Sequence, residues 1–450
     1  MASSSQLLDQ RPAETVTADV LVVGGGAAGL AAACTAARQG LKVVLLERYG
    51  FCGGAAVAGL SGTVCGLYLA RPEAAGKPEK IVFGFVDEFI STMNRRNGLT
   101  GPIRYGDTWT LVHEPLAWRE TGDELVQRHG VHVIYHATVI GVHMDGGERV
   151  EGVRAYTKQG VIDIRATITI DASGDADLFA MADLPTHVGL DGKVQNPTMI
   201  FRMGNVDVER FLGSYGGNSI MPDAVSQAII DANAAGTYKL PRAKVFLFPT
   251  PRDNELLCNC TRIIGRDGRE LNPLIAADLT EAEIEGRRQA RQYQEFFRAN
   301  LTGCENAILS DTGVQVGVRQ TRQIAGMDTL KNEDVETGRK RADAIARSAW
   351  PIELHSGVKP RLSWLYDDYY DIPLGCFVPS QGESLLATGR CLSAQHEAMA
   401  SARVTAQCFS YGHAIGHAAA LSVKENIPVR QLRASDVRTL LNKDGACLDA

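Results

Sequence analysis

Three glycines near the N-terminus have the spacing that lets a protein backbone bind a diphosphate. Gly24, Gly26 and Gly29 form the pattern G-x-G-x-x-G. In such a turn the first glycine allows a sharp bend, the second lets an anion approach the backbone, and the third lets a helix lie close to a sheet. The N-terminus of that helix presents free amide N–H groups to the anion. Ala27 and Ala28 lie between the glycines and belong to the same predicted binding turn.

The residues on both sides of the glycines supply the elements that must position them. Residues 20–23 are uncharged and β-branched, as in a strand that is buried on both faces. Residues 30–38 are rich in alanine and predict a helix, which Gly40 ends. A second strand, residues 41–46, is closed by Glu47 at the place where an acidic side chain bonds a ribose hydroxyl. The sequence therefore predicts a βαβ unit that binds a dinucleotide.

The loop after Glu47 indicates which dinucleotide is bound. A nicotinamide-binding domain normally continues into further βα repeats here, whereas residues 48–59 are mostly small. These residues resemble the family of FAD-dependent oxidoreductases with a glutathione-reductase-like FAD-binding domain, whose members often read E-R-x-G-x-x-G-G. The resemblance implies FAD as the cofactor. The residues of this loop that it places beside the cofactor are Arg48, Gly53, Gly54 and Ala55.

Later segments extend the resemblance. Residues 168–178, ITIDASGDADL, are similar to the second flavin fingerprint of the family, and residues 385–420 are similar to its last one. Residues 317–327 and 350–355 also match family patterns, whereas residues 196–315 match none. The resemblance implies further cofactor contacts at Thr138, Val139, Ala172, Ser173, Gly174, Asp177, Gly389 and Arg390, and at Ala402, Arg403 and Val404, which are expected to open a helix with its positive end toward the flavin.

Five side chains are candidates for catalysis, each with a structural alternative. His396, in the predicted flavin loop, could act as an acid or base or could bond the loop backbone. Arg319 and Arg322 are three residues apart and share a face only if the segment is helical. Together they could hold a substrate carboxylate, or they could pair with acidic residues between domains. His355 and Tyr369 are expected at a domain junction, in a catalytic or a structural role.

Composition excludes several classes of function. The formal charge is 46 − 52 = −6 without a basic block, which argues against nucleic acid as a partner. The ten cysteines lack metal-ligand spacing, so we expect no metal and a reducing, cytoplasmic location. Cys52 and Cys65 are too far apart for the C-x-x-x-x-C pair of flavin disulfide reductases. Residues 20–37 and 49–70 are uncharged but rich in Gly and Ala, and we expect no membrane span.

The predicted fold class is α/β. We expect a Rossmann-like FAD-binding domain, made of a parallel sheet and a β-meander, with an inserted α+β substrate domain. Helices are expected over residues 80–94, 115–129 and 280–300, the last opened by a Thr280-x-x-Glu283 capping box. The predicted domains are a flexible arm (1–17), the first part of the FAD-binding domain (18–195), the substrate or cap domain (196–370) and the second part of the FAD-binding domain (371–450).

The function that the resemblance implies is that of an FAD-dependent oxidoreductase, which transfers a hydride between a small organic substrate and the flavin. Three alternatives remain at this point. The chain could be a flavin oxidase or monooxygenase that uses oxygen, a flavin-binding subunit of an electron-transfer assembly, or a nicotinamide-only dehydrogenase. The sequence leaves the substrate, the final electron acceptor and covalent attachment of the flavin open, and it is compatible with a homo-oligomer.

Overall fold

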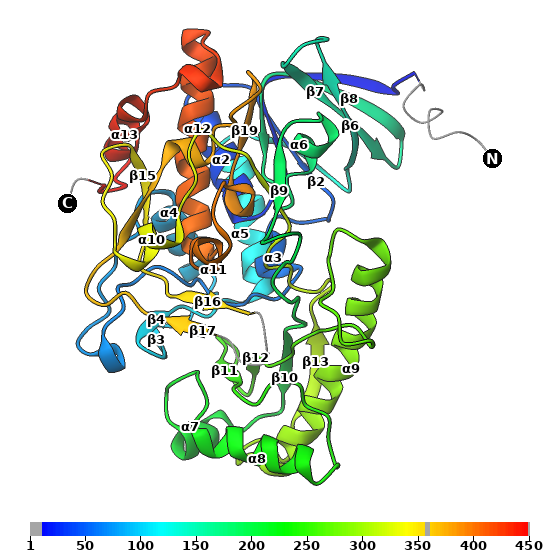
Figure 1. The fold of residues 1–450 in the computed structure, drawn as a ribbon, viewed down its shortest axis with the longest axis vertical. Helices are drawn as coiled ribbons and strands as arrows, with labels where there is room; N and C mark the ends of the chain where they lie inside the picture. Colours follow the sequence, from blue (N-terminus) through cyan, green and yellow to red (C-terminus); the bar gives the residue numbers. More distant parts are fainter. Residues whose placement is uncertain (1–10, 356–360, 449–450) are drawn as a thin grey trace.

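A seven-stranded sheet forms the centre of the larger part of the molecule (Figure 1). The computed structural model describes residues 11–355 and 361–448. Neighbouring strands run parallel from β5 through β2 and β1 to β8, and β19 adds to β8 in the same direction. Strands β7 and β6 continue the sheet as an antiparallel meander. The strands are β1 (Glu14–Val23), β2 (Val43–Glu47), β5 (His132–Tyr135), β6 (Thr138–Met144), β7 (Val150–Thr157), β8 (Gly160–Asp171) and β19 (Leu385–Ala387). The predicted parallel sheet and meander are therefore confirmed.

Strand β1 begins earlier than the sequence indicated. Glu14 is paired with Ile162 and Thr17 with Arg165, so residues 14–17 belong to the sheet rather than to an arm. Residues 1–10 of the predicted arm lie outside the described residues. The long strand β8 holds the two halves of the sheet together, because its first half pairs with β7 and its last three residues pair with β19.

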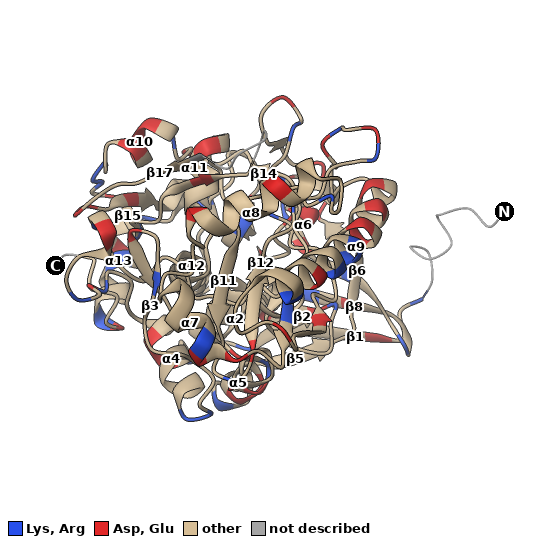
Figure 2. Cartoon of the chain, turned by 90° about the horizontal axis from the view of Figure 1, so that it is seen from below, with Lys and Arg blue, Asp and Glu red and all other residues tan. Residues whose placement is uncertain are grey.

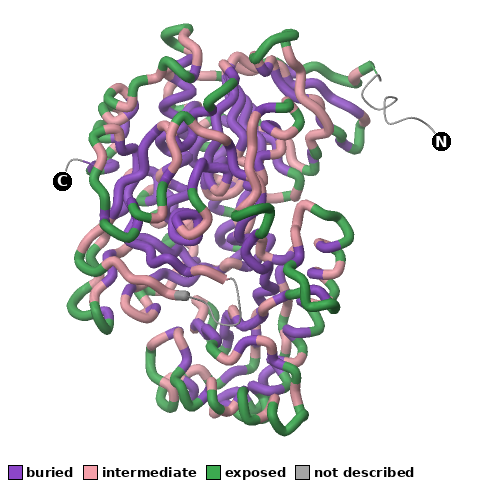
Figure 3. The backbone as a smooth tube through the Cα atoms, in the orientation of Figure 1, coloured by how far each residue is buried: buried purple, intermediate pink, exposed green. Residues whose placement is uncertain are grey.

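Two buried helices cover one face of this sheet and touch each other directly (Figure 3). They are α2 (Ala27–Arg38) and α12 (Thr405–Glu425). A Cβ atom built on Gly412 would lie 2.0 Å from the carbonyl oxygen of Ala28, and one on Gly416 would lie 2.6 Å from that of Ala32. Only glycine allows the two helix backbones to approach this closely.

Two further helices pack beside α2 and α12, namely α4 (Phe85–Asn94) and α5 (Pro115–Arg128). The prediction for α5 is accurate to one residue. Helix α4 begins five residues later than the predicted residue 80, because Gly84 has a φ of +91° and ends the preceding extended segment. The carboxylate of Asp87 then accepts a hydrogen bond from the backbone N–H of Gly84 at 3.0 Å.

A second hydrophobic core lies between Met199 and Val316, in the lower part of Figure 1. It is built on an antiparallel sheet in the order β11-β12-β10-β13. The strands are β10 (Phe201–Gly204), β11 (Phe246–Pro249), β12 (Leu256–Asn259) and β13 (Ile308–Thr312), and the helices around them are α7 (Val208–Tyr215), α8 (Asp223–Ala234) and α9 (Ala276–Asn300). The predicted α+β insertion is present.

The predicted capping box of α9 is wrong. The helix begins at Ala276, so Thr280 lies inside it and its hydroxyl donates to the carbonyl of Ala276 at 2.7 Å. Glu283 instead accepts a hydrogen bond from the backbone N–H of Val316 at 2.7 Å. Asp278, in the first turn, accepts from the N–H of Asn272 at 2.9 Å and fixes the true start. Both signs of charge are interspersed along α9 (Figure 2).

The structure also contains shorter elements. They include β3 (Ile103–Tyr105), β4 (Thr108–Thr110), β9 (Thr186–Val188), β14 (Arg322–Ile324), β15 (Ala344–Ser348), β16 (Ile352–Leu354), β17 (Arg361–Ser363), β18 (Tyr370–Pro373), α3 (Gly54–Val57), α6 (Asp177–Met181), α10 (Asn332–Glu336), α11 (His396–Ala402) and α13 (Ala434–Lys443). Leu330, Ile345 and Tyr370 pack into the core of the large sheet. The domain boundary at residue 370 remains a prediction, and this packing favours an earlier one near Val316. Among the described helices, none has the length and apolarity needed to cross a bilayer.

Candidate active site

The glycine turn after β1 has the geometry that its sequence predicted. Gly24 has a φ of +104°, and a Cβ there would lie 2.4 Å from the carbonyl oxygen of Ala172. A Cβ on Gly29 would lie 1.8 Å from the carbonyl oxygen of Gly24, so α2 packs tightly on the turn. In front of Gly26 there is room, because a Cβ would meet only the Cα of Gly54, at 3.9 Å. This space lies at the N-terminus of α2, which no side chain of the described residues caps.

Glu47 lies at the end of β2 with its carboxylate against the turn. One oxygen accepts the N–H of Gly25 at 2.7 Å and the other accepts the N–H of Tyr49 at 2.8 Å. Burial raises the pKa of this carboxyl group, while the two amides oppose that effect. The loop beyond it closes over the turn, since Gly53 and Gly54 have φ values of +152° and +47°. The remaining lone pairs of the carboxylate are available to ligand hydroxyls.

A cavity of about 300 Å³ begins at this turn and extends to the inserted core. Most of the predicted cofactor-binding residues line it: Gly24, Gly26, Ala27, Ala28, Glu47, Arg48, Gly53, Gly54, Ala55, Thr138, Val139, Ala172, Ser173, Gly174, Asp177, Gly389, Arg390, Arg403 and Val404. Gly29 and Ala402 do not line it. Gly29 brings α2 close to the turn, and the carbonyl of Ala402 accepts the hydroxyl proton of Tyr411 at 2.8 Å. Contact of the lining residues with a nucleotide remains a prediction.

The predicted opening of a helix at residues 402–404 needs correction. Ala402 is the last residue of α11, and Arg403 is the C-cap residue that follows it. Val404 then precedes α12, which begins at Thr405. Val404 and Thr405 line the cavity, so the positive end of α12 still faces it.

At the end of the cavity away from the glycine turn, two hydrogen bonds meet on one carboxylate. Glu353 Oε1 accepts the hydroxyl proton of Tyr105 at 3.0 Å and lies 3.0 Å from Nε2 of His355. Burial works to raise the pKa of Glu353, but His355 and Arg403 outweigh it and bring that pKa to about 2. Burial, assisted by the charge of Arg319, lowers the pKa of His355 to about 3. Near neutral pH the pair therefore consists of a carboxylate and an uncharged imidazole.

Two arginines line the same end of the cavity. Arg319 is 7% exposed and donates from Nη1 to the carbonyl of Asn196 at 2.6 Å. Arg403 donates from Nη2 to Gln195 Oε1 and to the carbonyl of Glu353, both at 3.4 Å. Burial lowers the pKa of both guanidinium groups. The charge of Arg403 adds to this effect on Arg319, and the charge of Arg390 adds to it on Arg403. We refer to Arg319, Arg403, Glu353, His355 and Tyr105 as the deep end of the cavity.

The five catalytic candidates do not come together. Arg319 and His355 line the cavity, but Arg322, His396 and Tyr369 do not. The segment with the two arginines is extended and enters β14, so their side chains do not share a helical face. Arg322 instead forms an ion pair with Asp177. His396 starts α11, and the ring of Tyr369 lies beneath Lys340, 3.9 Å from its Nζ, and beneath Arg347.

Two residues of the deep end, Glu353 and Tyr105, and the lining residue Trp350 were missed from the sequence. Glu353 and His355 are two residues apart in an extended chain, so they point to the same side, and this signal could have identified Glu353. Tyr105 comes from the hairpin of β3 and β4, 248 residues before Glu353. Trp350 also lines the cavity. Neither Tyr105 nor Trp350 carries a local sequence signal for this position.

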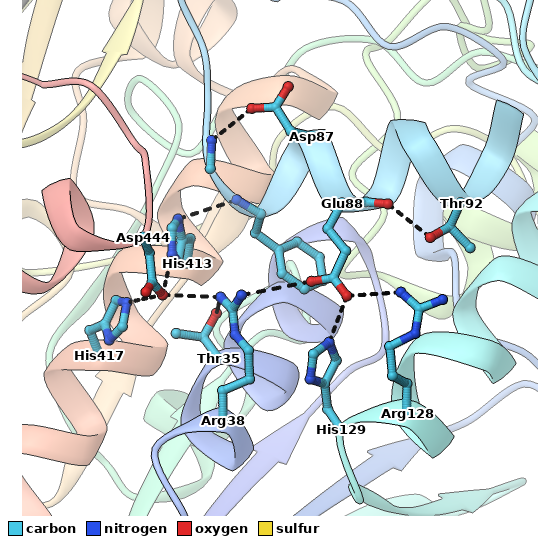
Figure 4. Close-up of polar contacts among 12 residues, drawn as sticks. Thr35, Arg38, Asp87, Glu88, Thr92, Arg128, His129, His413, His417 and Asp444 are labelled. Carbon is cyan, nitrogen blue, oxygen red and sulfur yellow. Dashed lines mark hydrogen bonds and ion pairs between the residues drawn. The ribbon is translucent and has the colours of Figure 1, made fainter.

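Elsewhere, one group of side chains within the described chain has the spacing of a metal site: His413, His417 and Asp444 (Figure 4). Asp444 lies 3.3 Å from His413 Nε2 and 3.0 Å from His417 Nε2, and it also pairs with Arg38 at 3.3 Å. The backbone N–H of Phe85 donates to Nδ1 of His413 at 3.5 Å, which places the ring proton on Nε2. A metal would need the lone pair on that nitrogen and would lie beside a guanidinium. The group therefore fits a hydrogen-bonded network better than a metal site.

A parallel sheet with a meander, a diphosphate-type glycine turn and a cavity shared with an inserted core place the chain in the dinucleotide-binding α/β class of folds. The chain matches the model of the family described as FAD dependent oxidoreductase over residues 19–441. It belongs to that family, and its cofactor is FAD.

One solved structure shows the same fold at low sequence identity, and others are similar to this chain with lower TM-scores. A geranylgeranyl bacteriochlorophyll reductase-like protein from Thermoplasma acidophilum is 15% identical, with 95% of this chain and 84% of that chain covered and a TM-score of 0.51. The p-nitrophenol 4-monooxygenase from Pseudomonas putida DLL-E4 is 12% identical over 97% of this chain and 91% of its own, with a TM-score of 0.49. The flavin-dependent brominase Bmp2 is 12% identical over 95% and 83%, with a TM-score of 0.48. Among curated proteins, no sequence matches this chain significantly.

Proposed function

We propose that this protein oxidises or reduces a small organic molecule by exchanging a hydride with FAD. The observation that carries the proposal is the continuity of one cavity. The space in front of Gly26 leads to Glu353 and His355, so a cofactor held at the first would reach the second. FAD supplies the two-electron acceptor or donor, and the protein supplies binding, orientation and proton transfer.

The residues near the turn fit the cofactor. A Cβ at Gly26 would fill the space that a diphosphate needs, and the N-terminal amides of α2 point toward that space. Glu47 is held by two backbone amides and would accept hydrogen bonds from a ribose. The N-terminus of α12 would favour negative charge at the pyrimidine end of a bound flavin.

Proton transfer is assigned to His355. Its Nε2 faces the ionised Glu353, which fixes the tautomer with a proton on Nε2 and leaves Nδ1 as an acceptor. When a substrate C–H gives up a hydride, His355 takes the proton from the neighbouring O–H or N–H group. Glu353 then stabilises the imidazolium that forms, and Tyr105 keeps Glu353 in place.

Visible spectroscopy of the purified protein tests this proposal. We expect flavin bands, release of FAD on denaturation, and anaerobic bleaching by at least one class among alcohols, amines, hydroxy acids and amino acids. The rate of reoxidation in air then separates an oxidase or monooxygenase from a dehydrogenase. A yellow protein that none of these classes bleaches contradicts the proposal and favours an electron-transfer subunit.

A further inference from the structure

The deep end of the cavity carries more positive than negative charge. Arg319 and Arg403 line it, and Arg242, 5% exposed, lies directly behind the lining residue Asn259, whose Oδ1 is 3.4 Å from its Nη1. All three guanidinium groups act electrostatically on Glu353 or His355. With His355 uncharged and Glu353 ionised, the formal sum of the group is 3 − 1 = +2. An excess of this size is costly in a buried site unless an anion joins it.

The acids nearby are already engaged elsewhere. Among the described residues that line the cavity, the other carboxylates are Glu47 and Asp177. Glu47 accepts two backbone amides at the glycine turn, and Asp177 pairs with Arg322 outside the deep end. Glu353 is consequently the one carboxylate of the described lining that faces these arginines.

Several buried donors at this end have no acceptor. Within residues 11–355 and 361–448, Nε of Arg403, Nε and Nη2 of Arg242 and Nε1 of Trp350 are buried without a hydrogen-bond partner. Native proteins rarely leave so many donors unpaired in one place, since each costs the desolvation of a polar group. Arg403 and Trp350 both line the cavity, so a ligand in the cavity can contact these two side chains.

An aromatic wall adjoins the arginines. The ring of Tyr105 stacks on Phe248 with centroids 5.8 Å apart and tilts against Trp350 at 5.0 Å, and all three residues line the cavity. This wall is apolar except for the two polar groups of Tyr105 and Trp350. A ligand that fits both features has an anionic head and an apolar or aromatic body.

We propose that the deep end is a carboxylate-binding subsite: the substrate of this enzyme is an organic acid, whose carboxylate lies between Arg319 and Arg403 and whose body lies against the aromatic wall. The inference rests on the proposed function, because it places this substrate beside the flavin. The sequence suggested that Arg319 and Arg322 together hold a substrate carboxylate. In the proposed subsite Arg403 takes the place of Arg322.

Difference spectra of the oxidised, FAD-containing protein test the subsite without turnover. Benzoate and its neutral isostere benzamide serve as probes at equal concentrations. We expect benzoate to perturb the flavin bands with saturation and benzamide to bind at least about tenfold more weakly. The Arg319→Met variant should lose benzoate affinity by at least about tenfold, and Arg319→Lys, which retains the charge but not the planar fork, should lose less.

Controls separate this inference from the proposed function. Arg287→Met, on the exposed face of α9 and paired only at the surface with Glu283, should bind benzoate like the unaltered protein. A protein that holds no FAD contradicts the proposed function itself. A yellow protein that binds benzamide as well as benzoate, or whose Arg319→Met variant retains its spectrum and full benzoate affinity, overturns the carboxylate subsite alone and assigns the excess charge to the flavin.

Discussion

Gly412 of α12 lies directly against the carbonyl of Ala28 in the first turn of α2, with no room for a side chain between them. Helix α12, from the C-terminal part of the chain, thus contacts helix α2, which starts at the glycine turn.

Gly412→Val is expected to lower the free energy of unfolding by about 3 kcal/mol, because the neighbouring atom is backbone and cannot rotate away. The midpoint of urea unfolding measures this effect. Gly213→Ala in α7 is the matched control: a Cβ there meets nothing within 4 Å, so the change should be neutral or stabilise by up to about 1 kcal/mol. Equal midpoints for the two variants would show that α2 and α12 are not in close contact.

Gly26→Ala should separate folding from cofactor binding. Gly26 has a φ of −66°, which alanine adopts freely, and its Cβ has space in the protein, so the variant should fold normally. The same Cβ occupies the path of the diphosphate, and we expect FAD affinity to fall by at least about tenfold. The ratio of bound flavin to protein after gel filtration is the measurement. Gly101→Ala, in open space, should retain all of its flavin.

Glu353→Gln should slow flavin reduction by the substrate about 100-fold while the flavin remains bound. The substitution removes the charge that stabilises a protonated His355 and leaves the side chain similar in size. Anaerobic stopped-flow reduction measures the rate. Because the pKa of Glu353 is about 2, the unaltered protein should show no acid limb from this group between pH 5 and 8. An unchanged reduction rate in the variant would show that Glu353 and His355 do not take part in proton transfer.

His113 should contribute to loss of stability in mild acid. Burial against Trp118 lowers the pKa of its imidazole to about 4, below the value of about 6.5 expected in the unfolded chain. Between these two values the unfolded state binds a proton that the folded state does not, so the free energy of unfolding falls as the pH falls. Between pH 7 and pH 5 this amounts to about 2 kcal/mol. His113→Leu should flatten the dependence of the urea midpoint on pH, and an unchanged slope would contradict this assignment.

Asp444→Asn should lower the free energy of unfolding by about 2 kcal/mol, because two histidines and Arg38 lose their common charged acceptor. Asp231→Asn on the exposed face of α8 should cost less than about 0.5 kcal/mol. Added Zn²⁺ or EDTA should leave the melting temperature of the unaltered protein constant. A rise of several degrees with Zn²⁺ would assign the group to a metal instead.

The glycine turn at one end of the cavity could be predicted because its signals are local. Gly24, Gly26 and Gly29 act through backbone conformation within six residues, and Glu47 follows at the distance that one βαβ unit requires. The parallel strands followed from runs of apolar residues, and the meander followed from alternating residues around glycine turns. The start of α9 was mispredicted because Thr280 and Glu283 match a capping pattern, whereas tertiary contacts of Asp278 and Glu283 set the true boundary.

The deep end could be predicted only in part. Arg319 and His355 were found through a family resemblance, but Arg322 was paired with Arg319 on an assumed helix that the chain does not form. Tyr105 contacts Glu353 from a hairpin that is distant in the sequence, and no residue spacing predicts this contact. Such contacts depend on how segments distant in the sequence pack together, which is a property of the whole fold.

The contact of α12 with α2 also sets an order of events in synthesis. Strand β1, helix α2 and strand β2 are synthesised well before α12, yet the face of α2 that contacts Gly412 and Gly416 has no cover until α12 has been made. The face of α2 that α12 covers therefore stays exposed while the intervening chain is made, and the Rossmann-type unit reaches its final packing only after α12 has been made. Chaperones that shield apolar nascent segments therefore have a natural target in α2.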